Sequence, residues 1–296
     1  MKNIAILLTC YNRKSKTLSC LHSLSHTYEL SGSALNISVY LTDDNSTDGT
    51  AEAVKNETYP FDIYVLPGTG NLYWNGGMIN SWRKAIACGG YDGYLLLNDD
   101  VVLLESFWKE LEDADKLSLS QHGKRGIYVG STCDSRTRQF TYGGFIFTNK
   151  LTLKDEYVIP DGETYQHCQC AHGNITYISS DVVNEMGIFC EEYIHGGTDH
   201  DYSYLAYKAG FPIIVLPNYA GLCENDHKED GYADFLMMSL KERLGYLNSP
   251  FGFNLHNTLL FQKRCFPYRY PFVWLMGYAK AVFPKTYFKI YKWLRR

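Results

Sequence analysis

Four apolar runs of strand length constrain the fold of this chain most strongly. They occupy residues 3–9, 36–43, 61–67 and 93–99. Continuous apolar runs of this kind are typical of strands buried on both faces of a parallel sheet. Stretches with helical spacing separate them up to residue 117. The sequence therefore predicts an α/β protein with a mostly parallel, Rossmann-like central sheet and helices on both faces.

Three of these runs lead into polar clusters, at residues 9–13, 43–46 and 98–100. In an open α/β sheet, ligands bind beyond the carboxyl ends of the strands, so the three clusters are expected to converge on one crevice. The segment "LLLNDDVVLL" places two adjacent acids inside an apolar run. Ionised carboxylates are costly to bury. A divalent cation shared with substrate phosphates would compensate them, whereas a solvated strand-end turn is the alternative.

The segment "GGTDHDYSYLAYKAG" carries two acids, Asp199 and Asp201, at a glycine-led helix start. Acids at this position favour the helix dipole, so capping is one interpretation. A catalytic carboxylate on a mobile loop is the other. Two nucleotide-binding motifs are excluded: Gly68 and Gly70 have no partner glycine at residue 73, and no Walker loop occurs.

Beyond residue 126, strands are expected at 126–132, 138–147, 174–179 and 211–217, the second of them in a hairpin. Nine cysteines without a CxxC pair indicate reduced thiols in a cytoplasmic protein. The dense segment "HCQCAH", residues 167–172, holds four ligand-type side chains that are too close together to surround one ion easily. No apolar run approaches the length of a membrane span.

The charge is distributed very unevenly along the chain. The first 242 residues contain 18 Lys/Arg and 32 Asp/Glu, a formal charge of −14, whereas residues 243–296 contain ten Lys/Arg and no acid. This C-terminal part also mixes aromatic residues with the basic ones. It predicts either helices with basic outer faces packed on the domain, or an interfacial helix on an anionic membrane surface. No RNA-binding motif accompanies the charge, so nucleic acid is not expected as a partner.

Taken together, the clusters resemble the inverting family 2 glycosyltransferases of the GT-A fold, of the type found in bacterial polysaccharide synthesis. The resemblance covers roughly residues 3–230 and rests on four segments in order: "LLTCYNR", "LTDDNSTDGT", "LLLNDDVVL" and "GTDHDYSYLAYKAGF". Two departures stand out. Thr198 occupies the place of the usual Glu, and Tyr204-Leu205-Ala206 lacks the Arg often found in that helix.

The resemblance implies a role for each matching residue. Asp199 would be the general base, and Asp100 with His227 would bind a Mn²⁺ or Mg²⁺ cofactor. The backbone amides of the glycines after residue 75 would meet anionic oxygens. Contacts to the nucleotide-sugar would come from Thr9, Tyr11, Asn12, Arg13, Asp43, Asp44, Asn71, Gly76, Gly77, Asn98 and Asp99.

The function expected from the resemblance is transfer of a hexose or deoxyhexose, with inversion, from a UDP- or dTDP-sugar donor. The acceptor would be a glycan or a lipid-linked oligosaccharide, and the protein would be cytoplasmic or peripheral on the inner face of the membrane. Residues 1–232 would form the GT-A domain, with a nucleotide-binding half (1–125) and an acceptor-binding half (126–232), and residues 233–296 a helical extension. A catalytically silent nucleotide-sugar-binding subunit of a membrane glycan complex is the main alternative, and a nucleotidyltransferase is a third.

Overall fold

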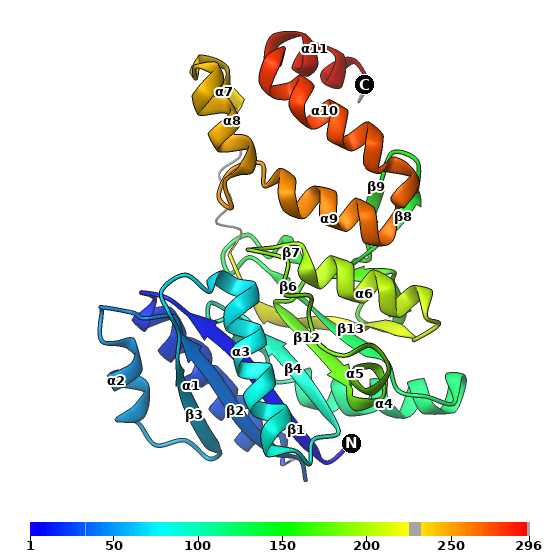
Figure 1. Ribbon diagram of the computed structural model, residues 1–296. Coiled ribbons are helices and arrows are strands. Elements are labelled where there is room, and N and C mark those ends of the chain that lie inside the picture. The colour runs from blue at the N-terminus through cyan, green and yellow to red at the C-terminus, as the bar shows by residue number, and fades with distance from the viewer. Residues whose placement is uncertain (33, 225–231, 295–296) are drawn as a thin grey trace. The chain divides into compact units, whose positions relative to one another are not determined.

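The computed structural model describes residues 1–32, 34–224 and 232–294 of the 296-residue chain (Figure 1). The chain divides into two compact units. The first comprises Met1–Glu191 and Thr198–Asn225, and the second comprises Glu192–Gly197 and Asp226–Arg296. The short segment Glu192–Gly197 is thus separated in sequence from the rest of its unit.

The first unit is built on a sheet with the strand order β10-β13-β6-β12-β4-β1-β2-β3. The pairs β1–β2, β2–β3, β1–β4 and β13–β6 are parallel, and β12 runs antiparallel to both of its neighbours. Two short strands, β5 and β7, pair with β13 and β6. The strands are β1 (Asn3–Cys10), β2 (Asn36–Asp43), β3 (Asp62–Pro67), β4 (Gly93–Leu97), β5 (Val102–Leu103), β6 (Ile127–Cys133), β7 (Phe140–Tyr142), β10 (Gln166–His167), β12 (Ile175–Ser179) and β13 (Ile213–Leu222).

Helices cover both faces of this sheet, as the two hydrophobic clusters of the unit show. Ile4, Ile6 and Leu8 of β1 join a cluster with α1, α2 and α4. Ala5 and Leu7 join another with α3, α5 and α6. Successive side chains of a strand point to opposite faces, so these helices lie on opposite sides. The predicted fold class is confirmed. The helices are α1 (Lys14–Ser31), α2 (Thr50–Lys55), α3 (Tyr73–Cys88), α4 (Phe107–His122), α5 (Ser180–Met186) and α6 (Thr198–Lys208).

The strand order places a switch point at β1, whose neighbours are β2 on one side and β4 on the other. The chain leaves β1 and β2 for helices on one face, α1 and α2, and leaves β3 for α3 on the other. The carboxyl ends of these strands therefore lie at one edge of the sheet, the edge at which ligands bind in open α/β sheets.

A second, three-stranded sheet has the order β11-β8-β9. Its strands are β8 (Gly144–Asn149), β9 (Lys154–Tyr157) and β11 (Cys170–Ala171), and β8 forms a hairpin with β9. The expected strand at 138–147 is therefore divided: β7 belongs to the large sheet and β8 to the small one. The division falls at Gly143, where a Cβ atom would lie 2.4 Å from Ser131 Oγ.

The second unit is helical. It contains α7 (Tyr232–Met237), α8 (Leu240–Asn248), α9 (Leu255–Cys265), the 3₁₀ helix η1 (Pro267–Arg269), α10 (Tyr270–Val282) and α11 (Pro284–Leu294). Its core includes Leu247 and Leu255. Among the residues that the structure describes, none of the helices combines the length and apolar character needed to cross a bilayer.

The segment Glu192–Gly197 is fixed to α9 by two residues. Asn257 accepts from the backbone amide of Ile194 at 3.3 Å and donates from Nδ2 to the carbonyl of Gly196 at 2.9 Å. His256 Nε2 lies 3.0 Å from the carbonyl of Glu192. Three backbone groups of this segment thus have partners in one turn of α9.

Candidate active site

Asp99 and Asp100 follow β4 and share one cation, the guanidinium of Arg13. Arg13 Nη1 donates to Asp99 Oδ1 at 2.9 Å, and Nη2 lies 3.1 Å from Asp100 Oδ2. The side chain of Asp99 is 5% exposed and that of Asp100 is 16% exposed. Burial raises the pKa of Asp99 to about 6, although Arg13 opposes the shift. The two acids thus lie where the sequence placed them, and Arg13 compensates their charge.

Asp44, at the end of β2, is buried and anchors the loop between β3 and α3. Its Oδ1 accepts from the amide of Gly70 at 2.7 Å, and its Oδ2 accepts from the amides of Leu72 at 2.8 Å and Tyr73 at 3.2 Å. A Cβ atom at Gly68 would lie 2.5 Å from Asp44 Oδ1, so the loop approaches too closely for any other residue. Asp44 therefore determines the shape of this loop.

Asn12 joins the loop after β1 to the loop after β2. Its amide donates to Ser46 Oγ at 2.9 Å, and its Oδ1 accepts from the amide of Thr47 at 2.7 Å. Its φ of 51° lies in the left-handed region, which Asn tolerates better than most residues. In the same pair of loops, Asp43 Oδ1 accepts from the amide of Ser46 at 2.9 Å, and Tyr11 exposes its ring. Three of the expected donor-site residues, Tyr11, Asn12 and Asp43, thus lie close together after β1 and at the end of β2.

Gly76 and Gly77 lie inside α3, which begins at Tyr73. The amide of Gly76 already donates to the carbonyl of Leu72 at 3.0 Å, so it is not available to an anion as expected. A Cβ atom at Gly77 would lie 2.0 Å from Thr9 Oγ1. Gly77 therefore allows α3 to pack closely on Thr9 of β1. Asn71, in the loop before α3, is exposed.

Trp74 links the acids after β4 to Asp199. Its Nε1 donates to Asn98 Oδ1 at 2.7 Å. On the other side, a Cβ atom at Gly173 would lie 2.6 Å from the indole ring and 3.5 Å from the Cβ of Asp199. One indole therefore connects Asn98, the residue before Asp99, with Gly173, which binds Asp199. The third and fourth segments of the resemblance thus meet at one place.

Asp199 lies in the first turn of α6 with both carboxylate oxygens bound to backbone amides. Oδ2 accepts from Gly173 at 2.8 Å, and Oδ1 accepts from His200 at 3.0 Å. Burial opposes its ionisation, but the neighbouring His200 and His172, together with these two amides, hold the pKa of Asp199 below its usual value. The carboxylate is thus kept ionised and in one orientation.

His172 and His200 flank Asp199, and the sequence reasoning did not assign them to the site. Their rings pack edge to face with centroids 4.8 Å apart, and His200 Nε2 lies 4.0 Å from Asp199 Oδ2. His172 Nδ1 lies 2.9 Å from the carbonyl of Gly143. Burial lowers the pKa of His172 to about 4, so its ring is neutral at pH 7. The local signal for His172 is the segment "HCQCAH", which it ends, but the segment by itself indicates only ligand-type side chains.

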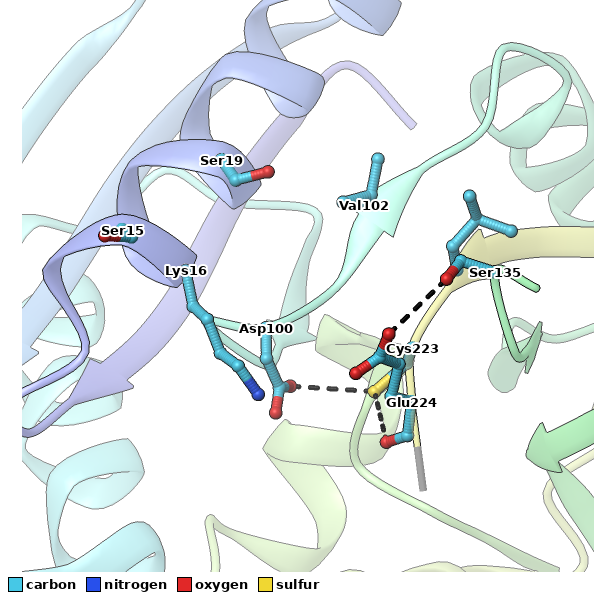
Figure 2. A pocket seen from close by; sticks show the side chains of 9 residues that line it. Ser15, Lys16, Ser19, Asp100, Val102, Ser135, Cys223 and Glu224 are labelled. Carbon is cyan, nitrogen blue, oxygen red and sulfur yellow. Dashed lines mark hydrogen bonds between the residues drawn. The ribbon is translucent and has the colours of Figure 1, made fainter. Parts of the chain in front are cut away.

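A pocket of about 290 Å³ lies beside Asp100 (Figure 2). Its lining comes from the first turns of α1, the loop after β4, β5, and the segments at the ends of β6 and β13. Asp100 points toward Cys223, whose thiol donates to Asp100 Oδ1 at 3.7 Å, and Lys16 extends along the same wall. The lining residues are Ser15, Lys16, Ser19, Asp100, Val102, Ser135, Leu222, Cys223 and Glu224.

The acids at this pocket fit a hard divalent cation that retains waters and takes oxygens from a substrate. Asp100 and Glu224 both offer carboxylate oxygens to the pocket, the ligand type that Mg²⁺ and Mn²⁺ prefer. Within residues 1–32, 34–224 and 232–294, no cluster of three or more His, Cys, Asp or Glu side chains could hold a metal ion by itself. His227, the other expected ligand, lies outside the described residues.

The sheet order and the helices on its two faces define the fold class. The chain has the GT-A fold, an α/β fold that it shares with solved structures. Residues 5–119 match the model of the family described as Glycosyl transferase family 2. This region contains the loops after β1 and β2 and the acids after β4, but not Asp199. The match covers less than half of the chain.

Several solved structures share this fold at low sequence identity. The mannosyltransferase PcManGT from Pyrobaculum calidifontis, in complex with GDP-Man and Mn²⁺, is 18% identical, with a TM-score of 0.52 over 94% of this chain and 75% of that one. S. aureus TarS 1–349 is 14% identical: its UDP complex has a TM-score of 0.56 over 95% of this chain and 90% of that one. Its UDP-GlcNAc complex has a TM-score of 0.54 over 95% and 80%. No curated protein matches the chain.

Proposed function

We propose that this protein transfers a hexose or deoxyhexose from a UDP- or dTDP-sugar to a glycan or lipid-linked acceptor, with inversion at the anomeric carbon. The observation that carries the proposal is the position of Trp74, whose indole bonds to Asn98 and contacts Gly173, the residue that holds Asp199. A donor held near Asp99 and Asp100 would thereby place its sugar close to an ionised carboxylate.

Asp199 would act as the general base. A sugar hydroxyl is a weak nucleophile, and a carboxylate within hydrogen-bond reach can accept its proton while the new bond to the anomeric carbon forms. The bond from that carbon to the donor phosphate breaks in the same step, and the nucleoside diphosphate leaves with the electron pair. One base without an enzyme nucleophile gives a single displacement, and a single displacement inverts the configuration.

The donor would lie across the carboxyl ends of β1, β2 and β4. The exposed ring of Tyr11 offers a stacking surface for the base. Asp43 and Asp44 are buried beneath the same loops and fix their shape through backbone amides, so we assign them to the nucleoside end of the site. Thr9, Asn12 and Asn71 complete this end.

The diphosphate would lie at the pocket beside Asp100. Asp100 would hold the Mn²⁺ or Mg²⁺ ion, with His227 as its proposed second ligand. A bound divalent ion would neutralise charge on the departing diphosphate. Because the ion would compensate Asp99 and Asp100, Arg13 would be released to reach a phosphate oxygen, and Lys16 lines the same pocket.

Asp199→Asn tests the proposal. The variant keeps the shape of the side chain, so UDP or dTDP should bind in the presence of Mn²⁺ as to the wild type. Product formation should fall by about a hundredfold to ten-thousandfold, the usual contribution of a general base. Asp113→Asn, an exposed acid on α4, is the matched control and should retain full activity.

The outcomes separate the candidate functions. Equal turnover by Asp199→Asn and wild type would refute the assignment of the base. Donor binding by the wild type without product from any acceptor would favour the silent nucleotide-sugar-binding subunit. Release of pyrophosphate, instead of a nucleoside diphosphate, would identify a nucleotidyltransferase.

A further inference from the structure

Helix α10 has one face that packs closely inside the second unit. Gly277 and Ala281 are its buried residues, and a Cβ atom at Gly277 would lie 2.6 Å from Leu255 Cδ1 of α9. Ala281 joins Leu247 and Leu255 in the core of the unit. Small residues one turn apart thus fix which side of α10 faces inward.

The rest of α10 exposes large apolar side chains. Phe272 is 63% exposed and Leu275 is 58% exposed, and with Val282 they recur at spacings that place them on one side of the helix. We call the following exposed set the aromatic face: Phe272, Leu275 and Val282 on one side of α10, Trp274 and Tyr278 toward the side of Gly277 and Ala281, and Tyr268 and Phe283 just outside the helix. Soluble surfaces rarely leave so many neighbouring apolar side chains uncovered unless a partner binds them.

Basic side chains precede and follow the aromatic face along the chain. Lys263 and Arg264 are exposed at the end of α9, before the face, and Lys285 and Lys289 are exposed on α11, after it. No Asp or Glu occurs after residue 242. A partner that fits this surface must therefore cover the apolar groups of the aromatic face and carry negative charge opposite the basic residues.

We propose that the aromatic face of α10 docks on a membrane surface that contains anionic lipids, with the helix lying in the plane of the interface. Trp and Tyr rings favour the boundary between headgroups and acyl chains. Each basic residue held near an anionic surface strengthens binding about fivefold. At 13 residues, α10 is about 20 Å long, too short to span the hydrocarbon core.

The same observations argue against two other occupants. A second copy of the chain would bring two identical faces together, and with them the Lys and Arg residues of α9 and α11 from both copies. A nucleic acid would match the charge, but Leu275 and Val282 offer nothing to bases or phosphates. A bilayer surface satisfies both the aromatic face and the basic residues before and after it.

Vesicle flotation with the full chain tests this proposal without donor or acceptor, so its outcome is independent of the proposed transferase activity. The protein should float with vesicles of equal parts phosphatidylcholine and phosphatidylglycerol, and remain unbound with phosphatidylcholine alone. High salt should weaken binding, because screening acts on exposed charges. Brominated lipid should quench the fluorescence of wild type more than that of Trp274→Phe.

A paired variant locates the contact. Phe272→Glu with Leu275→Glu should lower partitioning about tenfold or more, because two apolar contacts are lost and two acids are added to the face. Leu30→Glu with Leu151→Glu, at exposed apolar positions of the first unit, is the matched control and should bind as wild type. Circular dichroism checks that both pairs fold.

Three results would overturn the proposal. One is equal binding of neutral and anionic vesicles. Another is anionic binding that the Phe272→Glu, Leu275→Glu pair leaves intact. The third is absence of vesicle binding together with another association that this pair abolishes. Loss of dimerisation would assign the face to a second copy of the chain, and loss of oligonucleotide binding would assign it to nucleic acid.

Discussion

Arg13 forms an ion pair with Asp100, with Nη2 3.1 Å from Oδ2. The same guanidinium bonds to Asp99, so it lies where a divalent ion would compensate both acids. An ion that enters this place must compete with a positive charge already there.

Replacing this guanidinium should therefore strengthen metal binding. Arg13→Met keeps much of the apolar stem and removes the charge, and we expect it to bind Mn²⁺ about three- to tenfold more tightly than wild type in the absence of nucleotide. The estimate is modest because Arg13 is 39% exposed and solvent screens its charge. Titration of the free Mn²⁺ signal by electron paramagnetic resonance measures it. Arg13→Lys, which retains the charge, should resemble wild type; equal affinity in all three proteins would contradict the competition.

The contact between α3 and β1 can be tested at two adjacent glycines. Gly77→Ala would place a methyl group 2.0 Å from Thr9 Oγ1, so the helix must move, and overpacking of this kind should cost about 1–3 kcal/mol of unfolding free energy. At Gly76 the nearest atom would be Leu72 Cβ, at 3.2 Å. Gly76→Ala should cost little or even stabilise the protein, because Ala favours a helix interior by about 1 kcal/mol. Urea denaturation measures both, and similar losses in the two variants would show that the contact with Thr9 is unimportant.

Loss of the indole N–H of Trp74 should affect activity more than stability. Trp74→Phe removes the bond to Asn98 and part of the contact with Gly173, so we expect kcat/KM to fall by about tenfold or more, as misplaced reacting groups imply. Trp82→Phe is the control. Trp82 is fully buried, and its Nε1 makes no hydrogen bond in the described part of the chain. That variant should lower the melting temperature and leave kcat/KM near wild type; the reverse pattern would exclude Trp74 from the site.

His172 should make stability depend on pH in the mildly acidic range. Its pKa is about 4 in the folded protein and 6.5 ordinarily, so between these values the unfolded chain binds more protons and acidification favours unfolding. From pH 7.5 to pH 5 the loss from this group is about 2 kcal/mol. The charge of His172 interacts with Asp199 and His200 of α6 and with Asp155 of β9. The variant and the wild type must therefore differ at residue 172 alone. Urea denaturation at pH 7.5 and pH 5 measures the fall in unfolding free energy between these values. The fall should be smaller in His172→Asn than in wild type by about 2 kcal/mol. An equal fall in the two proteins would contradict a buried neutral His172.

The sequence predicted the sheet because its strands are continuous apolar runs, and predicted the crevice because their carboxyl ends must share one edge. It placed Asp44, Asp100 and Asp199 correctly at strand and helix ends. It could not predict which backbone amides Asp44 binds, because Gly70, Leu72 and Tyr73 reach it only through the path of a loop. Nothing local in the sequence pairs Arg13 with acids 86 residues away.

Other features escaped because they depend on tertiary packing. His172 and His200 are 28 positions apart and meet only when β11 lies beside α6. The glycines after residue 75 suggested anion binding, whereas the space around Gly77 shows a packing role. The assignment of Glu192–Gly197 to the helical unit likewise depends on Asn257, more than sixty residues further along the chain.

The bonds from Asn257 and His256 to Glu192–Gly197 have a consequence for dissecting the molecule. A truncation after residue 224 would keep the sheet and all of α6. It would delete α9, and with it the hydrogen bonds from Asn257 and His256 to the segment that leads into α6. Thr198 and Asp199 would then follow a segment, Glu192–Gly197, that has lost its hydrogen bonds to α9. We therefore expect that residues 1–224 alone would hold the start of α6 less firmly than the full chain does.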